Sequence, residues 1–155
     1  MAAFFFDTSA LVKYYHVEAG TSAVLEIFAQ EDRKIRISTP GLLEAWSAFA
    51  AKVRSGEIDR NTAGILRARL MLDIAAGELE VFTLSREHLE LAGRLIGRHS
   101  FSIRLRTLDA LQLAVAVDLK SLTLMDYFVV ADKALFEVAR LEGLAALNPE
   151  NTPST

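Results

Sequence analysis

The sequence predicts an α/β fold, a three-layer sandwich in which helices flank a central, mostly parallel sheet of four to five strands. Short runs that are apolar throughout alternate with longer stretches of helical periodicity. A strand that is apolar on both faces is buried on both faces, and parallel neighbours need a crossover between them. With 155 residues, 52% of them hydrophobic, the chain can bury one sizeable core, which predicts a single domain.

The expected elements alternate along the chain. The strands are expected at residues 3–7, 34–38, 79–84, 127–132 and, as an optional fifth, 144–147. The helices are expected at residues 9–15, 21–32, 40–56, 60–77, 86–99, 108–120 and 133–143. Pro40 and Gly56 mark the two ends of the third helix, and Ser85 and Thr107 are the expected N-caps of the fifth and sixth.

Composition narrows the class of protein. The chain has no cysteine, which excludes disulfides and thiolate metal sites and fits a reducing cytoplasm. The first apolar run lacks the basic start of a signal peptide, and no apolar stretch is long enough to cross a bilayer, so we expect a cytoplasmic protein without a membrane partner. A net charge of −3 argues against a general nucleic-acid coat but allows a local basic groove. We expect one domain over residues 1–148 and a flexible tail over 149–155.

Two of the expected strands end in aspartate, Asp7 after "AAFFF" and Asp132 after "YFVVA". Ligands of parallel sheets gather at the carboxyl ends of the strands, so both carboxylates are expected on one rim. Asp109 lies near the start of a helix, and Glu44 lies inside the otherwise apolar "GLLEAWSAFAA". An N-cap or first-turn role remains an alternative for each aspartate. Glu44 needs a partner, and Lys52 is too far round the helix to serve.

Carboxylates that gather without basic neighbours repel one another, so such a cluster persists only if protons or a cation compensate its charge. Hard oxygen ligands without His or Cys suit Mg²⁺ or Mn²⁺, which we therefore expect as the cofactor. Asp126 precedes the fourth strand and is expected at the opposite rim from Asp132.

Four stretches in order resemble the acidic motifs of PIN domains of the VapC toxin type: "FFFDTSALVKYY", "STPGLLEAWSAF", "TLDALQLAVA" and "YFVVADKALFEVARLEGLAALNPE". The resemblance covers nearly the whole chain. It implies a PIN-like sandwich and a Mg²⁺- or Mn²⁺-dependent endoribonuclease, a homodimeric toxin held inactive by a cognate antitoxin. Carried over residue by residue, it implies that Asp7, Glu44, Asp109 and Asp132 are the catalytic acids and metal ligands, and that Ser9 supports them by hydrogen bonding.

The sequence departs from the family at one point. The family commonly has a hydroxyl residue one or two positions before the last acid, where this chain has Val130 and Ala131. We therefore expect Asp132 to lack one polar support.

The ligands predict hydrolysis by water. A cation held by Asp7 and Asp109, with Glu44 reached directly or through water, could activate a water molecule and stabilise charge on the scissile phosphate. No histidine is placed as in a metal-free ribonuclease, and no Ser–His–Asp arrangement is visible. The expected products carry a 5′-phosphate and a 3′-hydroxyl.

The stretch "RLIGRHSFSIRLR" carries several basic residues and no acid directly before the motif of Asp109. We expect its arginines to bind RNA phosphates, and Phe101 to stack on an unpaired base. These expected substrate-binding residues are Arg94, Arg98, Arg104 and Arg106. The alternative is a solvated helix end, where basic residues oppose the negative end of the helix dipole.

Two other functions remain open. A haloacid-type phosphatase needs two aspartates separated by one residue, and "DTS" lacks the second. A catalytically weakened PIN-fold module that binds RNA or protein is consistent with the missing hydroxyl before Asp132.

Overall fold

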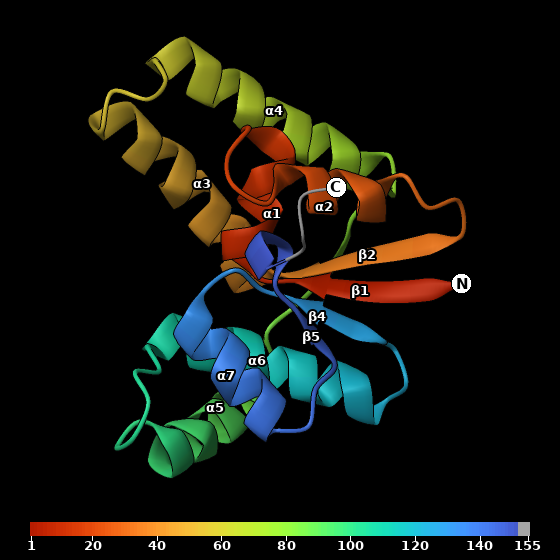
Figure 1. Ribbon diagram of the computed structural model, residues 1–155, viewed down its shortest axis with the longest axis vertical. Helices are drawn as coiled ribbons and strands as arrows, with labels where there is room; N and C mark the ends of the chain where they lie inside the picture. The colour runs from red at the N-terminus through yellow and green to blue at the C-terminus, as the bar shows by residue number, and fades with distance from the viewer. Residues whose placement is uncertain (152–155) are drawn as a thin grey trace.

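The computed structural model describes residues 1–151 and has a five-stranded parallel sheet at its centre (Figure 1). The strands are β1 (Ala2–Phe6), β2 (Arg33–Ser38), β3 (Glu80–Phe82), β4 (Tyr127–Val129) and β5 (Ala146–Leu147). Their order across the sheet is β3-β2-β1-β4-β5, and every neighbouring pair is parallel. The predicted sheet is confirmed, with five strands.

Helices cover both faces of the sheet, which confirms the three layers. The helices are α1 (Thr8–Tyr15), α2 (Thr21–Phe28), α3 (Thr39–Arg54), α4 (Arg60–Ala75), α5 (Arg86–His99), α6 (Thr107–Ser121) and α7 (Lys133–Leu141), followed by the 3₁₀ helix η1 (Pro149–Asn151). Helices α1 to α4 lie on one face, and α5 to α7 lie on the other (Figure 1). No helix within residues 1–151 is long and apolar enough to span a membrane.

The run of three phenylalanines in β1 serves both layers. Phe5 packs into the core beneath α5, α6 and α7, whereas Phe4 and Phe6 pack into the core beneath α1 to α4. Successive side chains of a strand point to opposite faces, so a central strand covered on both sides has no polar position. This explains why the run is apolar until it reaches the edge of the sheet at Asp7.

The structure differs from the sequence expectation at several boundaries; α2 ends at Phe28 and not at residue 32, for example, and β4 ends at Val129 and not at residue 132. Arg106, and not Thr107, is the N-cap residue of α6. Residues 149–151, expected as the start of a flexible tail, form η1, in which Pro149 is buried and Glu150 pairs with Lys13 at 2.7 Å. The polar composition of this segment hid the ion pair that attaches it. The rest of the expected tail, 152–155, lies outside the described residues.

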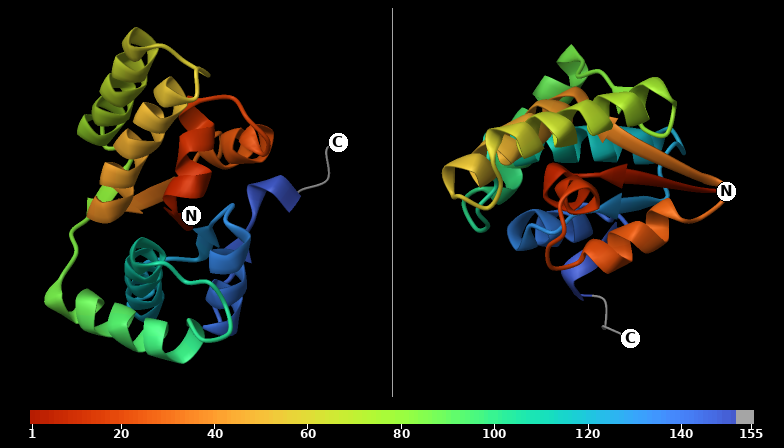
Figure 2. Two further views of the ribbon diagram at one scale, coloured as in Figure 1. Left: turned by 90° about the vertical axis from the view of Figure 1, so that its left-hand side faces the viewer. Right: turned by 90° about the horizontal axis from the view of Figure 1, so that it is seen from above.

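The carboxyl ends of the strands form one edge of the sheet, which faces the viewer in the left panel of Figure 2. Helices α1, α3 and α7 are the elements that follow β1, β2 and β4 at this edge. Helix α6 also begins here, after the loop that follows α5 (Figure 2). The N-terminal ends of four helices therefore lie around one region of this edge, and the candidate acids lie in that region.

Candidate active site

Asp7 is held at the end of β1 by both backbone and side-chain contacts. Its backbone N–H donates to the carbonyl of Val129 at 2.9 Å, and its carboxylate caps α1 by accepting from the Ser9 N–H at 3.0 Å. The Ser9 hydroxyl donates to the same carboxylate oxygen at 2.5 Å. Burial raises the pKa of Asp7 to about 6; the Ser9 hydrogen bonds oppose this shift, and the charges of Asp109 and Asp132 add to it. The cap interpretation is thus confirmed, yet the hydrogen bonds of the cap offset only part of the cost of burying this charge.

Glu44 enters the site from α3. Its Oε1 atom is buried and has no hydrogen-bond partner within residues 1–151. Burial, followed by the charges of Asp7 and Asp109, raises the pKa of Glu44 to about 7, and the charge of Arg106 opposes this shift. Lys52, as expected, pairs elsewhere, with Glu18 at 2.8 Å. A buried carboxylate oxygen without a partner, next to other acids, is a feature that binding and catalytic sites often show.

Asp109 and Asp132 share one basic partner, Arg106. The Arg106 Nε donates to Asp109 at 3.2 Å, and its Nη2 lies 3.5 Å from Asp132. The hydrogen bond with Asp109, and then the charge of Asp109, raise the pKa of Arg106. Asp132 also caps α7 by accepting from the Leu135 N–H at 2.9 Å. These two acids therefore have cap or ion-pair roles that Glu44 lacks.

The structure brings all four expected acids together. They line one pocket of about 340 Å³, which we call the acidic pocket, together with Ser9 and Arg106. Within residues 1–151, no three acidic, imidazole or thiol side chains are arranged as ready-made metal ligands. Neither Asp7 nor Glu44 forms an ion pair in this part of the chain, where Arg106 pairs only with Asp109 and Asp132. The oxygen donors and the uncompensated charge fit a divalent cation such as Mg²⁺ or Mn²⁺.

A buried polar layer under the acidic pocket was missed by the sequence analysis. Gln112 accepts from the Ser38 hydroxyl at 2.6 Å and donates to the Thr8 hydroxyl at 3.1 Å. A Cβ on Gly41 would meet the Gln112 amide nitrogen at 2.9 Å, so glycine at this position leaves room for the Gln112 side chain. This layer fixes α1, α3 and α6, the helices that follow or carry Asp7, Glu44 and Asp109. Its signal was the position of Gln112, three residues after Asp109 on the same helix face.

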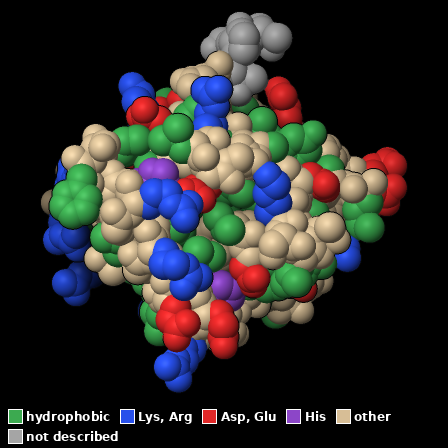
Figure 3. Space-filling view, turned by 90° about the horizontal axis from the view of Figure 1, so that it is seen from below, with side chains coloured by type: hydrophobic (Ala, Val, Ile, Leu, Met, Phe, Trp, Pro, Cys, Tyr) green, Lys and Arg blue, Asp and Glu red, His purple; other side chains and the backbone are tan. Residues whose placement is uncertain are grey.

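The four arginines expected to bind RNA lie in different environments. Arg106 lies in the acidic pocket, whereas Arg98 pairs with Glu142 at 2.7 Å. Arg94 and Arg104 are exposed and form no ion pair or hydrogen bond within residues 1–151. Phe101 is 95% exposed. Figure 3 shows Lys and Arg side chains spread over the lower face and mixed with acids, so they form no continuous basic groove there.

Known structures share this fold across nearly the entire chain. VapC20 of Mycobacterium tuberculosis, described as a sarcin-ricin loop cleaving toxin, has a TM-score of 0.68 and 17% identity, covering 97% of this chain and 99% of its own. VapBC2 of Rickettsia felis, bound to a promoter DNA fragment, has a TM-score of 0.65 and 18% identity, covering 94% and 98%. FitAcB of Neisseria gonorrhoeae has a TM-score of 0.65 and 14% identity, covering 96% and 99%.

At these identities the solved structures establish the fold alone. A comparison with curated proteins found no match. The model of the PIN domain family, however, matches residues 4–141. This range contains all four carboxylates of the acidic pocket, from Asp7 at the end of β1 to Asp132 at the start of α7. The chain belongs to the PIN domain family.

Proposed function

We propose that this protein is a Mg²⁺- or Mn²⁺-dependent endoribonuclease that hydrolyses RNA phosphodiester bonds. The observation that carries the proposal is the acidic pocket, in which the buried Oε1 of Glu44 has no partner within residues 1–151. Membership of the PIN domain family supports the same reading. A site with this much uncompensated negative charge binds cations, and a cation can in turn attract a phosphate.

Asp7, Glu44 and Asp109, with Asp132, would hold the ion. A bound Mg²⁺ or Mn²⁺ supplies a Lewis acid that activates water and stabilises charge developing on the scissile phosphate. Asp7 is fixed for this role by its two hydrogen bonds from Ser9. The products would carry a 5′-phosphate and a 3′-hydroxyl.

Two further side chains would act on the reacting groups. Glu44, whose buried Oε1 has no partner within residues 1–151, would orient the attacking water or accept its proton. Arg106 has a side chain that is 60% exposed, so its guanidinium can turn from Asp132 towards a phosphate oxygen. Arg94 and Arg104, both exposed, would hold phosphates farther along the strand, and Phe101 would stack on an unpaired base.

We also propose that the protein is a homodimeric, cytoplasmic toxin with a cognate antitoxin. The support is that similar structures include VapBC2 and FitAB, both described in complex with DNA. Expression without a partner should inhibit growth, and Asp109→Asn should relieve the inhibition. Equal inhibition by both forms would contradict toxicity through catalysis.

The enzymatic proposal is tested by incubating purified protein with single-stranded RNA and Mg²⁺ or Mn²⁺, and by identifying the product ends. Cleavage that leaves 5′-phosphates and stops in EDTA is the expected result. Cleavage that continues in EDTA would contradict the metal requirement.

One observation favours a second candidate, a weakened PIN-fold module that binds RNA or protein. Arg106 neutralises part of the charge of Asp109 and Asp132, and no ready-made group of three metal ligands is present in residues 1–151. This module would bind RNA without cutting it, whichever divalent ion is supplied.

A further inference from the structure

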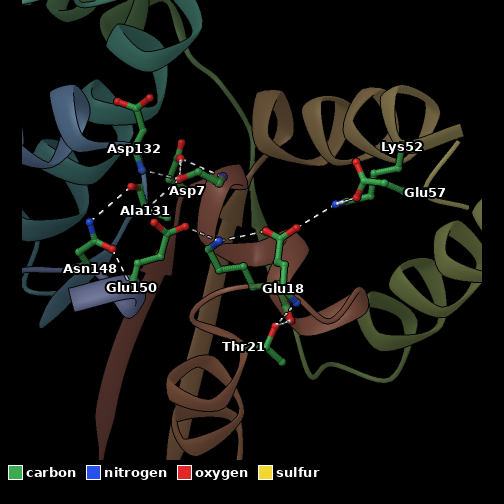
Figure 4. Close-up of polar contacts among 11 residues, drawn as sticks. Asp7, Glu18, Thr21, Lys52, Glu57, Ala131, Asp132, Asn148 and Glu150 are labelled. Carbon is green, nitrogen blue, oxygen red and sulfur yellow. Dashed lines mark hydrogen bonds and ion pairs between the residues drawn. The ribbon is translucent and has the colours of Figure 1, made fainter. Parts of the chain in front are cut away.

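A chain of hydrogen bonds leads from Asp7 to the C-terminal turn of the described chain, residues 148–151 (Figure 4). It passes through Ser9 and Ala131 to Asn148 and continues through Glu150 to Lys13. The last described residues are therefore joined to the centre of the acidic pocket, although none of them lines it.

The Ser9 hydroxyl is the hub of this chain. It donates to Asp7 at 2.5 Å and accepts from the backbone N–H groups of Ala131 at 3.0 Å and Asp132 at 3.2 Å. A hydroxyl has one proton to donate and two lone pairs, so all its bonding capacity is used. Ser9 thus supplies the polar support that Val130 and Ala131 cannot.

The opposite side of Ala131 is held by Asn148. The ladder between β4 and β5 ends where the Val130 N–H donates to the Leu147 carbonyl at 2.9 Å. Proline has no N–H, so Pro149 cannot donate the next bond. The side-chain amide of Asn148, which is 8% exposed, instead donates to the Ala131 carbonyl at 3.4 Å. The pairing is thereby extended to the residue directly before Asp132.

Glu150 fixes Asn148 in this position. The Glu150 N–H donates to the Asn148 Oδ1 at 2.9 Å, and its carboxylate pairs with the buried Lys13 at 2.7 Å. Lys13 lies one helical turn after Ser9 on the same face of α1. Gly20, with φ +87°, leaves room for the turn, because a Cβ there would lie 3.0 Å from the Pro149 carbonyl carbon. The turn is thus tied to the helix that carries Ser9.

We propose that Asn148 and Glu150, with Lys13, are positioning residues of the acidic pocket. They hold the peptide of Ala131 and Asp132 against the Ser9 hydroxyl, and so fix the orientation of Asp7 and the place of Asp132. The kinetic consequence rests on the proposed function. The structural consequence, that the backbone N–H groups of Ala131 and Asp132 stay bonded to Ser9, does not depend on the proposed function.

A competing interpretation is that these residues hold RNA. Lys13 and Glu150 line a groove of about 540 Å³ that also includes Ser9 and Asp132. A group that holds substrate changes KM, whereas a group that places catalytic atoms changes kcat at constant KM. The two interpretations therefore differ in the kinetic constant that they affect.

The test compares Asn148→Ala and Glu150→Gln with Glu57→Gln in the full chain. Glu57 also pairs with a lysine, Lys52 at 3.2 Å, but none of its hydrogen bonds reaches Ala131. With single-stranded RNA, we expect the first two variants to lose roughly 10- to 100-fold in kcat at unchanged KM, as is usual for groups that orient metal ligands. Glu57→Gln should match the wild type. A rise in KM at unchanged kcat, or no change in either constant, would overturn the proposal.

Amide hydrogen exchange, followed by NMR, tests the structural part without any activity. The N–H groups of Ala131 and Asp132 should exchange faster in Asn148→Ala and Glu150→Gln than in the wild type and Glu57→Gln. Unchanged exchange at both amides would overturn the proposal, even if kcat had fallen. If Asn148→Ala does not fold, Glu150→Gln decides, because the Glu150 side chain is 37% exposed and glutamine preserves its shape. If the wild type cuts no RNA, the proposed function fails and exchange alone decides this inference.

Discussion

Glu44 and Glu18 are both partly buried glutamates near the carboxyl edge of the sheet, but their surroundings differ in one respect. Glu18 accepts hydrogen bonds from Lys13 at 3.0 Å and from Lys52 at 2.8 Å. Burial opposes its ionisation, yet the bonds from the two lysines outweigh burial and lower its pKa. Glu44 has no such partner among the described residues, and burial followed by the charges of Asp7 and Asp109 raises its pKa to about 7.

This difference shows which carboxylates stabilise the fold and which are free for a ligand. In the lysine-bound group, Glu18, Glu57 and Glu150 each meet an ammonium within the chain. In the acidic pocket, Arg106 reaches only Asp109 and Asp132 within the described residues. Uncompensated charge is costly and is usually retained only where function needs it.

The largest expected effect is the loss of RNA cleavage in Asp7→Asn. Loss of an outer-shell partner typically costs 10- to 100-fold, so loss of a direct ligand should lower kcat by about 1,000-fold or more. Asp126→Asn is the matched control, because Asp126 bonds the Ala3 N–H at 2.8 Å at the opposite edge of the sheet. Initial rates with saturating RNA measure both. Full activity in Asp7→Asn would end the proposed mechanism.

The next effect is stabilisation by metal. An ion that binds only the folded state at about 100 times its Kd adds about 2.7 kcal/mol. This raises the Tm of a chain of this size by roughly 5 to 10 °C. Glu44→Gln should show a smaller shift because a ligand is lost, and Glu57→Gln should behave as the wild type. A wild-type Tm that neither Mg²⁺ nor Mn²⁺ changes would argue against a metal site.

The pH dependence of the metal-free protein gives a smaller effect. The pKa of Asp7 rises from 3.8 in the unfolded chain to about 6 in the folded one, so the folded state binds more protons between these values. Stability is therefore highest at the acidic end of this window and falls as pH rises. From pH 5 to pH 8 the loss due to Asp7 is about 1.4 kcal/mol, and Glu44 adds to it in the same direction.

Asp7→Asn should remove this contribution, and Asp126→Asn should not. Urea unfolding at pH 5 and pH 8, without metal, measures the difference between the two pH values for each protein. If the free energy of unfolding depends on pH equally in Asp7→Asn and in the wild type, folding does not raise the pKa of Asp7, and the prediction is wrong.

The smallest expected effect concerns RNA affinity. Arg94 and Arg104 are exposed and form no pair within residues 1–151, whereas Arg98 pairs with Glu142 at 2.7 Å. If the first two bind phosphates of single-stranded RNA, the double alanine variant should flatten the salt slope of log Kd by about 1.4. Arg98→Ala should leave the slope unchanged. Titrations at several salt concentrations check this, and an unchanged slope in the double variant would assign both arginines to the solvated surface.

The sequence predicted the fold and the meeting of the acids for one physical reason. Strands apolar on both faces require a parallel sheet between helices, and parallel strands end at one edge. Asp7 directly follows β1, and Asp132 follows β4 after two intervening residues, so the two acids were expected to lie close together at this edge. Glu44 was predicted as a site residue because its neighbours in the sequence are apolar. In the structure its Oε1 is indeed buried and has no hydrogen-bond partner within residues 1–151.

Other features depended on distances between segments far apart in the chain. The run of arginines gave no sign that Arg98 would meet Glu142 or that Arg106 would join Asp109 to Asp132. The polar end of the chain likewise gave no sign that Glu150 would find Lys13. These ion pairs join residues that are far apart in the sequence and lie close together only in the folded protein.

The most direct test makes the same chemical change, glutamate to glutamine, once in the acidic pocket and once in the lysine-bound group. RNA cleavage in Mg²⁺ is followed for the wild type, Glu44→Gln and Glu57→Gln, each shown to be folded by its thermal melt. We predict that the wild type and Glu57→Gln cleave at equal rates and that Glu44→Gln does not cleave measurably. Cleavage by Glu44→Gln at the wild-type rate would contradict the claim that the uncompensated carboxylates form the active site.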